Sequence, residues 1–193
     1  MTWPLGEDLT QVRDELAAAY ATGRGYHDTR HLAEVLDRIE ELAAAGEEFD
    51  ERAVRLAAWF HDGVYDGEPG AEERSAQWAE DALRGRPEAD EVGRLVRLTE
   101  HHRPEPGDGN GCVLSDADLA ILAAPPGRYA EYVADVRGEY AHVPDVLFAT
   151  GRAAVLRDLL AKPTLFHTAH ARAHWEPAAR ANVEAELTEL AQV

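Results

Sequence analysis

Apolar residues recur along this chain at intervals of three and four residues, and the alternation typical of β-strands is nearly absent. Asp28 and Asp50 stand where each can cap the helix that follows it. The pattern predicts helices over residues 7–20, 28–45, 50–61, 71–84, 87–102, 113–122, 129–140 and 144–161, and a last helix from residue 177. We therefore expect an all-α bundle of about eight to nine helices, with residues 1–193 forming a single domain.

One stretch, Arg55–Tyr65, combines a buried helix with two metal-ligand side chains. The apolar helix runs directly into His61 and Asp62, and Gly63 is expected to stop it. Burying an imidazole and a carboxylate together is costly unless a partner satisfies both. A metal ion is one such partner, because it accepts imidazole nitrogen and carboxylate oxygen at once. A His–Asp hydrogen bond that closes the helix end is the alternative, and this dipeptide alone does not decide between them.

Two further histidines fall on apolar helix faces. His31 shares a face with Val35 in the helix over residues 28–45, so it is expected to point at the core. If the helix over residues 87–102 continues to its end, His102 lies one turn after Leu98 and also faces inward. His101 falls on the charged face and is expected to be solvated. A histidine triplet at His167, His170 and His174 is expected to be a solvated cluster.

Composition limits the classes of partner. Lys and Arg total 19 against 37 Asp and Glu, which gives a net charge of −18 and argues against a nucleic-acid polymer or an anionic membrane. A small anionic substrate then requires local cations or a metal. The single Cys112 excludes an internal disulfide framework, and no apolar run or signal-peptide pattern is present. The expected protein is soluble and cytoplasmic, either a monomer or a homodimer.

The candidate ligands come from three separate helices, and only a helical bundle would bring them together. Their order, H…HD…D, resembles the HD-domain metal-dependent phosphohydrolase superfamily, and is most similar to its small bacterial predicted phosphohydrolases. The segments that carry this resemblance cover most of the chain: Tyr26-His27 with His31, His61–Tyr65, Glu72–Ala76, Thr99 with His102, Asp116–Leu119, Arg137–Tyr140, Gly151-Arg152 and Ala179–Asn182.

The resemblance implies one divalent ion, either a transition metal (Mn, Fe, Co, Ni or Zn) or Mg, held by His31, His61, Asp62 and a late aspartate. Asp118 is favoured as that aspartate because it shares a face with Leu114 and follows an alanine, as the family's last ligand usually does. Asp116 is the runner-up. The alternative roles are a helix N-terminus stabilised by Asp116 and a capping box between Ser115 and Asp118.

The activity implied by the resemblance is hydrolysis of a phosphate ester, such as a nucleotide or another small phosphorylated metabolite. Asp62 would both bind the metal and orient or deprotonate the attacking water. The candidates for proton transfer or ligand orientation are His27, His102 and Glu73. The candidates for substrate contact are Arg24, Arg137, Arg152 and Tyr65, although each arginine has a surface ion pair as its alternative role.

Two other functions remain open. Some members of the superfamily hold two irons and perform oxygenation, and in this chain His102, with His101, would have to provide the extra ligands. The other alternative is a non-catalytic, nucleotide-binding regulatory module, which would be expected to have a broken ligand set.

Overall fold

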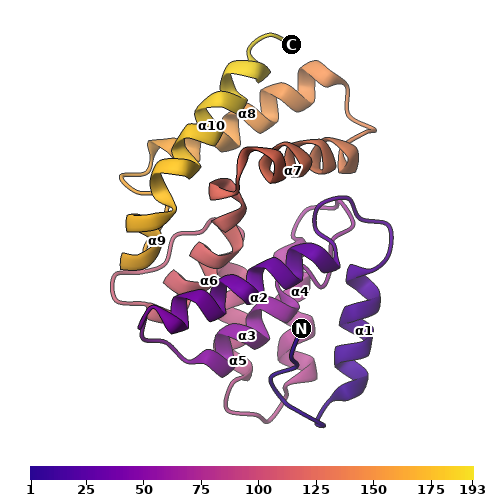
Figure 1. Cartoon of the computed structure of the whole chain (residues 1–193). Helices are drawn as coiled ribbons and strands as arrows, with labels where there is room; N and C mark the ends of the chain where they lie inside the picture. Colours follow the sequence, from indigo (N-terminus) through magenta and orange to yellow (C-terminus); the bar gives the residue numbers. More distant parts are fainter. The chain divides into compact units, whose positions relative to one another are not determined.

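The computed structural model describes all 193 residues, and it consists of helices joined by loops, with no β-strand (Figure 1). The all-α helical bundle predicted from the sequence is confirmed. There are ten α-helices and one short 3-10 helix: α1 (Thr10–Tyr20), α2 (Thr29–Ala44), α3 (Glu51–Phe60), α4 (Ala71–Ala82), α5 (Ala89–Leu98), α6 (Gly109–Leu119), η1 (Ala120–Ala123), α7 (Pro126–Glu139), α8 (Asp145–Ala161), α9 (Ala169–His174) and α10 (Glu176–Leu190). None of these helices has both the length and the apolar character of a membrane span.

The chain divides into two compact units, Met1–Asp118 and Leu119–Val193. The first contains α1 to α5 and nearly all of α6, and the second contains η1 and α7 to α10. All of the predicted metal ligands belong to the first unit. Arg137 and Arg152 belong to the second.

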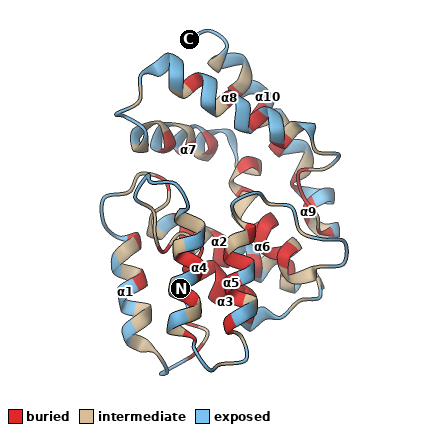
Figure 2. Cartoon of the chain, turned by 180° about the vertical axis from the view of Figure 1, so that it is seen from behind, coloured by how far each residue is buried: buried red, intermediate tan, exposed pale blue.

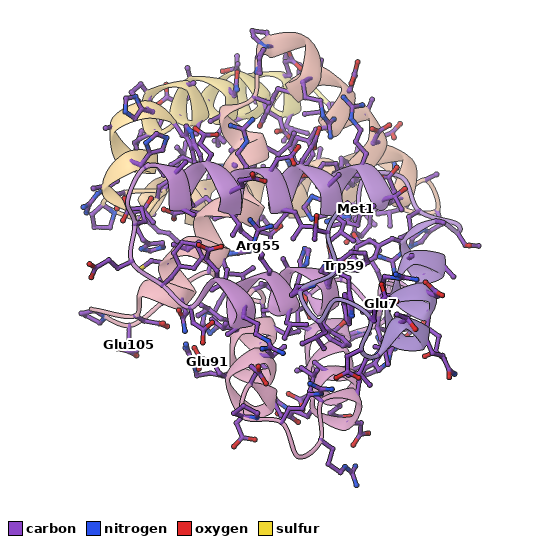
Figure 3. The ribbon with its side chains drawn as sticks, turned by 60° about the horizontal axis from the view of Figure 1, so that its bottom comes forward. Met1, Glu7, Arg55, Trp59, Glu91 and Glu105 are labelled. Carbon is purple, nitrogen blue, oxygen red and sulfur yellow. The ribbon has the colours of Figure 1, made fainter.

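The core of the first unit is built around α3, which packs against α2, α4 and α5. Nearly every residue of α3 from Ala53 to Phe60 is buried. In Figure 2 the buried residues of this unit gather along α3, α5 and α6. Trp59 is 3% exposed and lies among the interior side chains, whereas Glu105 projects at the edge (Figure 3). The helix that ends at the His61-Asp62 pair is therefore the most deeply embedded one in its unit.

Both predicted N-caps are present. The carboxylate of Asp28 accepts hydrogen bonds from the N–H groups of Arg30 and His31, at 2.8 and 3.1 Å. Asp50 does the same at the start of α3, accepting from Arg52 and Ala53 at 3.0 and 3.1 Å. Each cap satisfies N–H groups that have no partner within the helix. The cap at Asp28 also fixes the first turn of α2, where His31 lies.

The predicted helix over residues 87–102 is too long at its C-terminal end. Helix α5 ends at Leu98, and His102 takes a left-handed conformation with φ of 51° while its N–H donates to the Leu98 carbonyl at 2.9 Å. Pro104 follows two residues later, as is common after such a helix end. His102 is nevertheless the more buried of the two histidines, and His101 is exposed. The difference in burial between His101 and His102 therefore comes from this turn and not from a continuing helix.

The predicted start of the next helix at residue 113 is also wrong, because α6 begins at Gly109. Asp108 accepts a hydrogen bond from the Gly111 N–H at 2.9 Å and is itself held by Arg94 at 2.7 Å, so the glycine-rich stretch is drawn into the helix. Ser115 and Asp116 are consequently in the middle of α6. Neither the capping box nor the stabilised N-terminus is possible there.

The second unit is held by a buried polar network that joins α7, α8 and α10. Arg152 donates to Glu186 at 2.7 Å and to the Tyr132 hydroxyl at 2.7 Å, and the Tyr129 hydroxyl donates to Glu186 at 2.5 Å. The side chains of Arg152 and Glu186 are only 12% and 3% exposed. Arg152 is therefore part of a buried ion pair within its own unit.

We predict that Arg152→Ala lowers the free energy of unfolding by about 3–5 kcal/mol, because it leaves the buried Glu186 carboxylate without a counter-charge. Urea unfolding followed by circular dichroism measures this loss. Arg13→Ala is the matched control, since Arg13 bonds the exposed Asp14 and its loss should cost less than about 1 kcal/mol. Equal unfolding curves for the two variants would contradict a structural role for Arg152.

Candidate metal centre

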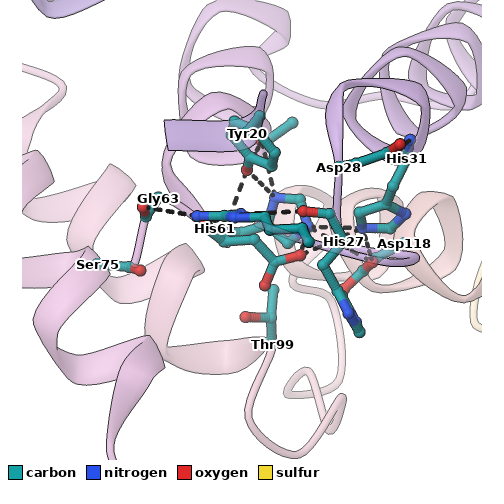
Figure 4. A network of polar contacts seen from close by, with 12 residues as sticks. Tyr20, His27, Asp28, His31, His61, Gly63, Ser75, Thr99 and Asp118 are labelled. Atoms are coloured by element: carbon teal, nitrogen blue, oxygen red, sulfur yellow. Dashed lines mark hydrogen bonds and ion pairs between the residues drawn. The ribbon is translucent and has the colours of Figure 1, made fainter. Parts of the chain in front are cut away.

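Two histidines and two aspartates from three helices meet inside the first unit. His31 lies in the first turn of α2, His61 is the C-cap of α3 and Asp62 follows it, while Asp118 comes from the last turn of α6. His31 and His61 are 1% and 2% exposed, and the side chains of Asp62 and Asp118 are 15% and 14% exposed. Figure 4 shows His31, His61 and Asp118 directed toward one another. The cluster is buried on the histidine side and reaches solvent on the carboxylate side.

The separations between the four side chains are short. The Nε2 atoms of His31 and His61 are 3.1 Å apart. Asp62 Oδ2 lies 3.4 Å from His31 Nε2 and 3.1 Å from His61 Nε2. Asp118 Oδ1 lies 3.2 and 3.6 Å from the same two nitrogens. Each of the two carboxylates thus lies close to both imidazole nitrogens.

This arrangement fits a metal ion. Ligand atoms about 2.0–2.2 Å from one ion lie roughly 2.8–3.6 Å apart at neighbouring corners of its coordination shell, which is the range seen here. Asp62 Oδ2 is buried and receives no hydrogen bond, although two imidazole nitrogens lie close to it. His31, His61 and Asp118 together form a group that could hold a metal ion, and neither Asp62 nor Asp116 belongs to it. The set of two imidazoles with carboxylates suits a divalent transition metal.

The backbone orients His61 for this role. Its Nδ1 lies 2.7 Å from the Ala58 carbonyl oxygen, which can only accept, so Nδ1 carries the hydrogen and neutral His61 presents a bare Nε2 to the cluster. The Tyr20 hydroxyl lies 3.4 Å from the same Nδ1 and accepts the Asp62 N–H at 3.2 Å. Burial raises the pKa of Tyr20 above its ordinary range, so the phenol stays neutral.

Electrostatics within the cluster are strongly coupled. Burial by itself would lower the pKa of His31 and His61, but the nearby carboxylates of Asp62 and Asp118 outweigh it. The pKa of His31 is raised, and that of His61 is raised well above its ordinary value of 6.5. Burial would likewise raise the pKa of both aspartates, yet the neighbouring imidazoles, His61 foremost, hold each one below its ordinary range. The imidazoles and the carboxylates thus favour each other's charged forms.

His102 borders the cluster on its solvent side. Its Nε2 lies 3.6 Å from Asp118 Oδ2, and its Nδ1 lies 3.2 Å from the Ser115 hydroxyl. A positive φ at a histidine is strained, and such strain is often found at functional sites. The left-handed turn after α5 therefore brings this imidazole to the outer oxygen of Asp118.

The other residues proposed from the sequence have different surroundings. Glu73 accepts hydrogen bonds from Arg97 at 2.6 Å and from Gln77 at 2.8 Å, and these lower the pKa of Glu73 to about 2. His27 stacks on Tyr65 with ring centroids 4.1 Å apart. Their roles in proton transfer and substrate contact stay predictions.

The two arginines proposed for phosphate contact in the second unit are bonded within it. Arg137 donates to the carbonyls of Tyr140 and Val143, at 2.6 and 3.0 Å, and to Asp145 at 2.5 Å. Arg152 takes part in the buried network with Glu186. The sequence left a surface ion pair as the alternative role for each arginine. Arg137 makes such a pair with the exposed Asp145, whereas the pair of Arg152 with Glu186 is buried.

Sequence reasoning missed Tyr20 and the link between Ser115 and His102. Tyr20 is an ordinary apolar position of α1 in the helical pattern, and nothing in the sequence tells that its hydroxyl reaches a segment about 40 residues away. Comparison of the chain with protein-family models, with curated proteins and with solved structures finds no match.

We predict that His61→Ala and Asp62→Ala each lose bound metal, because each removes one of about four protein ligands. Metal content of the purified variants, measured by elemental analysis after dialysis against Co²⁺, tests this. His101→Ala is the control, since His101 is exposed and lies outside the cluster. Wild-type occupancy in either variant would contradict the ligand assignment.

Metal binding should also depend on pH. A metal takes neutral imidazole, so binding must displace the protons that His31 and His61 retain above their ordinary pKa. The apparent affinity for Co²⁺ should therefore rise from about pH 6 to about pH 8. The raised histidine pKa values also stabilise the metal-free fold most at low pH, and this contribution is lost as pH rises through them. Calorimetry in buffers with different ionisation enthalpies counts the released protons; no release at neutral pH would contradict the prediction.

Proposed function

We propose that this protein is a metal-dependent phosphohydrolase that cleaves a phosphate ester of a small metabolite such as a nucleotide. One observation carries the proposal: two imidazole nitrogens lie 3.1 Å apart, and each lies 3.1–3.6 Å from a carboxylate oxygen of Asp62 and from one of Asp118, in a cluster with a solvent-facing side. The ordered motif that resembles the HD-domain phosphohydrolase superfamily supports the same assignment. The four residues that would hold the ion are His31, His61, Asp62 and Asp118.

When bound, a divalent ion lowers the pKa of a water, polarises a phosphoryl oxygen and provides local positive charge in a protein whose net charge is −18. The residues have separate tasks around it. The two imidazoles are buried and fixed, so they hold position and exclude water from one side. The side chain of Asp62, like that of Asp118, is partly exposed, and its carboxylate would orient an attacking water and accept its proton.

His102 is the residue best placed to give a proton to the leaving group. It is partly exposed, its Nδ1 contacts Ser115, and its Nε2 faces Asp118 at 3.6 Å.

The test is a hydrolysis screen over nucleotides and sugar phosphates, with Mn²⁺, Co²⁺, Ni²⁺ and Mg²⁺ added in turn to metal-free protein. Phosphate release that requires an added metal, and that Asp62→Ala abolishes, is expected. The absence of hydrolysis with every metal in a protein that binds them would contradict the proposal and favour a regulatory module. About two irons per chain in elemental analysis would instead favour an oxygenase.

The histidine pair at positions 101 and 102 provides a matched comparison. We predict that His102→Ala lowers kcat by about 100-fold or more, the usual contribution of a general acid, while metal content is retained. His101→Ala should leave kcat at the wild-type value, because His101 is exposed and accepts a hydrogen bond from the Arg103 N–H. Equal effects of the two substitutions on the best substrate of the screen would remove His102 from the mechanism.

A further inference from the structure

Arg24 lies in the loop between α1 and α2, and its guanidinium is directed at backbone carbonyls. One terminal nitrogen, Nη1, donates to the His27 carbonyl at 3.0 Å and to the Asp62 carbonyl at 2.6 Å. The other, Nη2, donates to the Gly63 carbonyl at 3.1 Å. These acceptors belong to two segments that are far apart in the sequence.

Both segments carry metal ligands. The His27 carbonyl lies one turn before His31, at the entry to α2, and the Asp62 and Gly63 carbonyls belong to the corner that follows His61. Carbonyl groups at the end of a helix have no partner within the helix, and a cation is favourable there. The guanidinium therefore connects the segment before one histidine ligand to the segment that contains the other histidine and the first aspartate.

Two aromatic rings fix the guanidinium in place. Its central carbon lies 4.8 Å from the Tyr20 ring centroid and 5.7 Å from that of Tyr65. Tyr20 itself accepts the Asp62 N–H, so the same corner is held by a second contact. A planar guanidinium can meet carbonyls in its own plane and aromatic rings on its faces, whereas an ammonium group lacks this shape.

The corner is closely packed around Gly63. A methyl group at Gly63 would lie 3.1 Å from the Phe60 carbonyl, 3.1 Å from the Trp78 ring and 3.2 Å from Leu16. The Val64 N–H is tied to the Ser75 hydroxyl at 3.0 Å. The corner is thus packed around Gly63 and held by the hydrogen bonds of Arg24 to the Asp62 and Gly63 carbonyls. The position of Asp62 relative to His31 depends on these hydrogen bonds.

We propose that Arg24 is a positioning residue that sets the metal affinity of the centre, and not a direct contact to the substrate phosphate. This inference rests on the proposed metal site, because it concerns the distance between the segments that hold its ligands. Groups that orient metal ligands without touching the metal typically change affinity by about 10- to 100-fold when removed. Arg24 acts on three backbone carbonyls at once, so its loss should fall in this range.

The experiment is a titration of metal-free protein with Co²⁺, which reports affinity and, through its visible absorption, ligand geometry. Arg24→Ala should bind Co²⁺ about 10- to 100-fold more weakly than wild type and change the shape of the visible band. Arg24→Lys should fall between them, because it retains the charge and loses the planar fork. Arg13→Ala, whose guanidinium in the wild type bonds only to the exposed Asp14, is the matched control and should titrate like wild type.

Chemical rescue separates positioning from a general loss of fold. Methylguanidinium, at concentrations well below those that unfold the protein, should restore Co²⁺ affinity to Arg24→Ala, and methylammonium should not. Wild-type affinity in Arg24→Ala would overturn the inference, and if only kcat/KM fell, Arg24 would be a phosphate contact. If Arg24→Ala does not fold, Arg24→Lys decides by the same titration.

The outcomes also separate this inference from the proposed function. A wild-type protein that binds Co²⁺ and hydrolyses nothing removes the phosphohydrolase assignment, while the comparison of affinities still tests Arg24. A wild-type protein that binds no metal overturns both.

Discussion

The first unit depends on one electrostatic constraint: two buried imidazoles lie within a few ångströms of two partly buried carboxylates. Each would be destabilised alone, because burial disfavours its charged form. Together they compensate, since the raised pKa values of His31 and His61 match the lowered values of Asp62 and Asp118. A divalent ion bound by neutral imidazoles would likewise balance the two carboxylates.

The cluster is assembled where helices begin and end. His31 occupies the first turn of α2 behind the Asp28 cap, and His61 is the C-cap of α3. His102 lies in the left-handed turn after α5. Backbone groups are unpaired at such positions, so side chains like those of Arg24 and Tyr20 can bind them and fix the corner. Helix ends thus supply both the ligands and the contacts that orient them.

Arginines in this acidic chain mostly bind the protein itself. Arg24 bonds carbonyls beside the cluster, Arg137 bonds the end of its own helix, and Arg152 neutralises the buried Glu186. With a net charge of −18, such internal pairing relieves repulsion between carboxylates within each unit.

Periodicity and capping residues alone determined the helical class, the N-caps at Asp28 and Asp50, and the inward faces of His31 and Asp118, because these depend on neighbours three or four positions away. Tertiary structure decided the rest. It ended α5 before His102, drew the glycine-rich stretch after Asp108 into α6, and brought the Tyr20 hydroxyl to Asp62. The roles of single arginines were equally undetermined by the sequence, since a guanidinium bonds whichever acceptor the fold brings within reach. Contacts between segments tens of residues apart leave no local pattern, and only the packed chain specifies them.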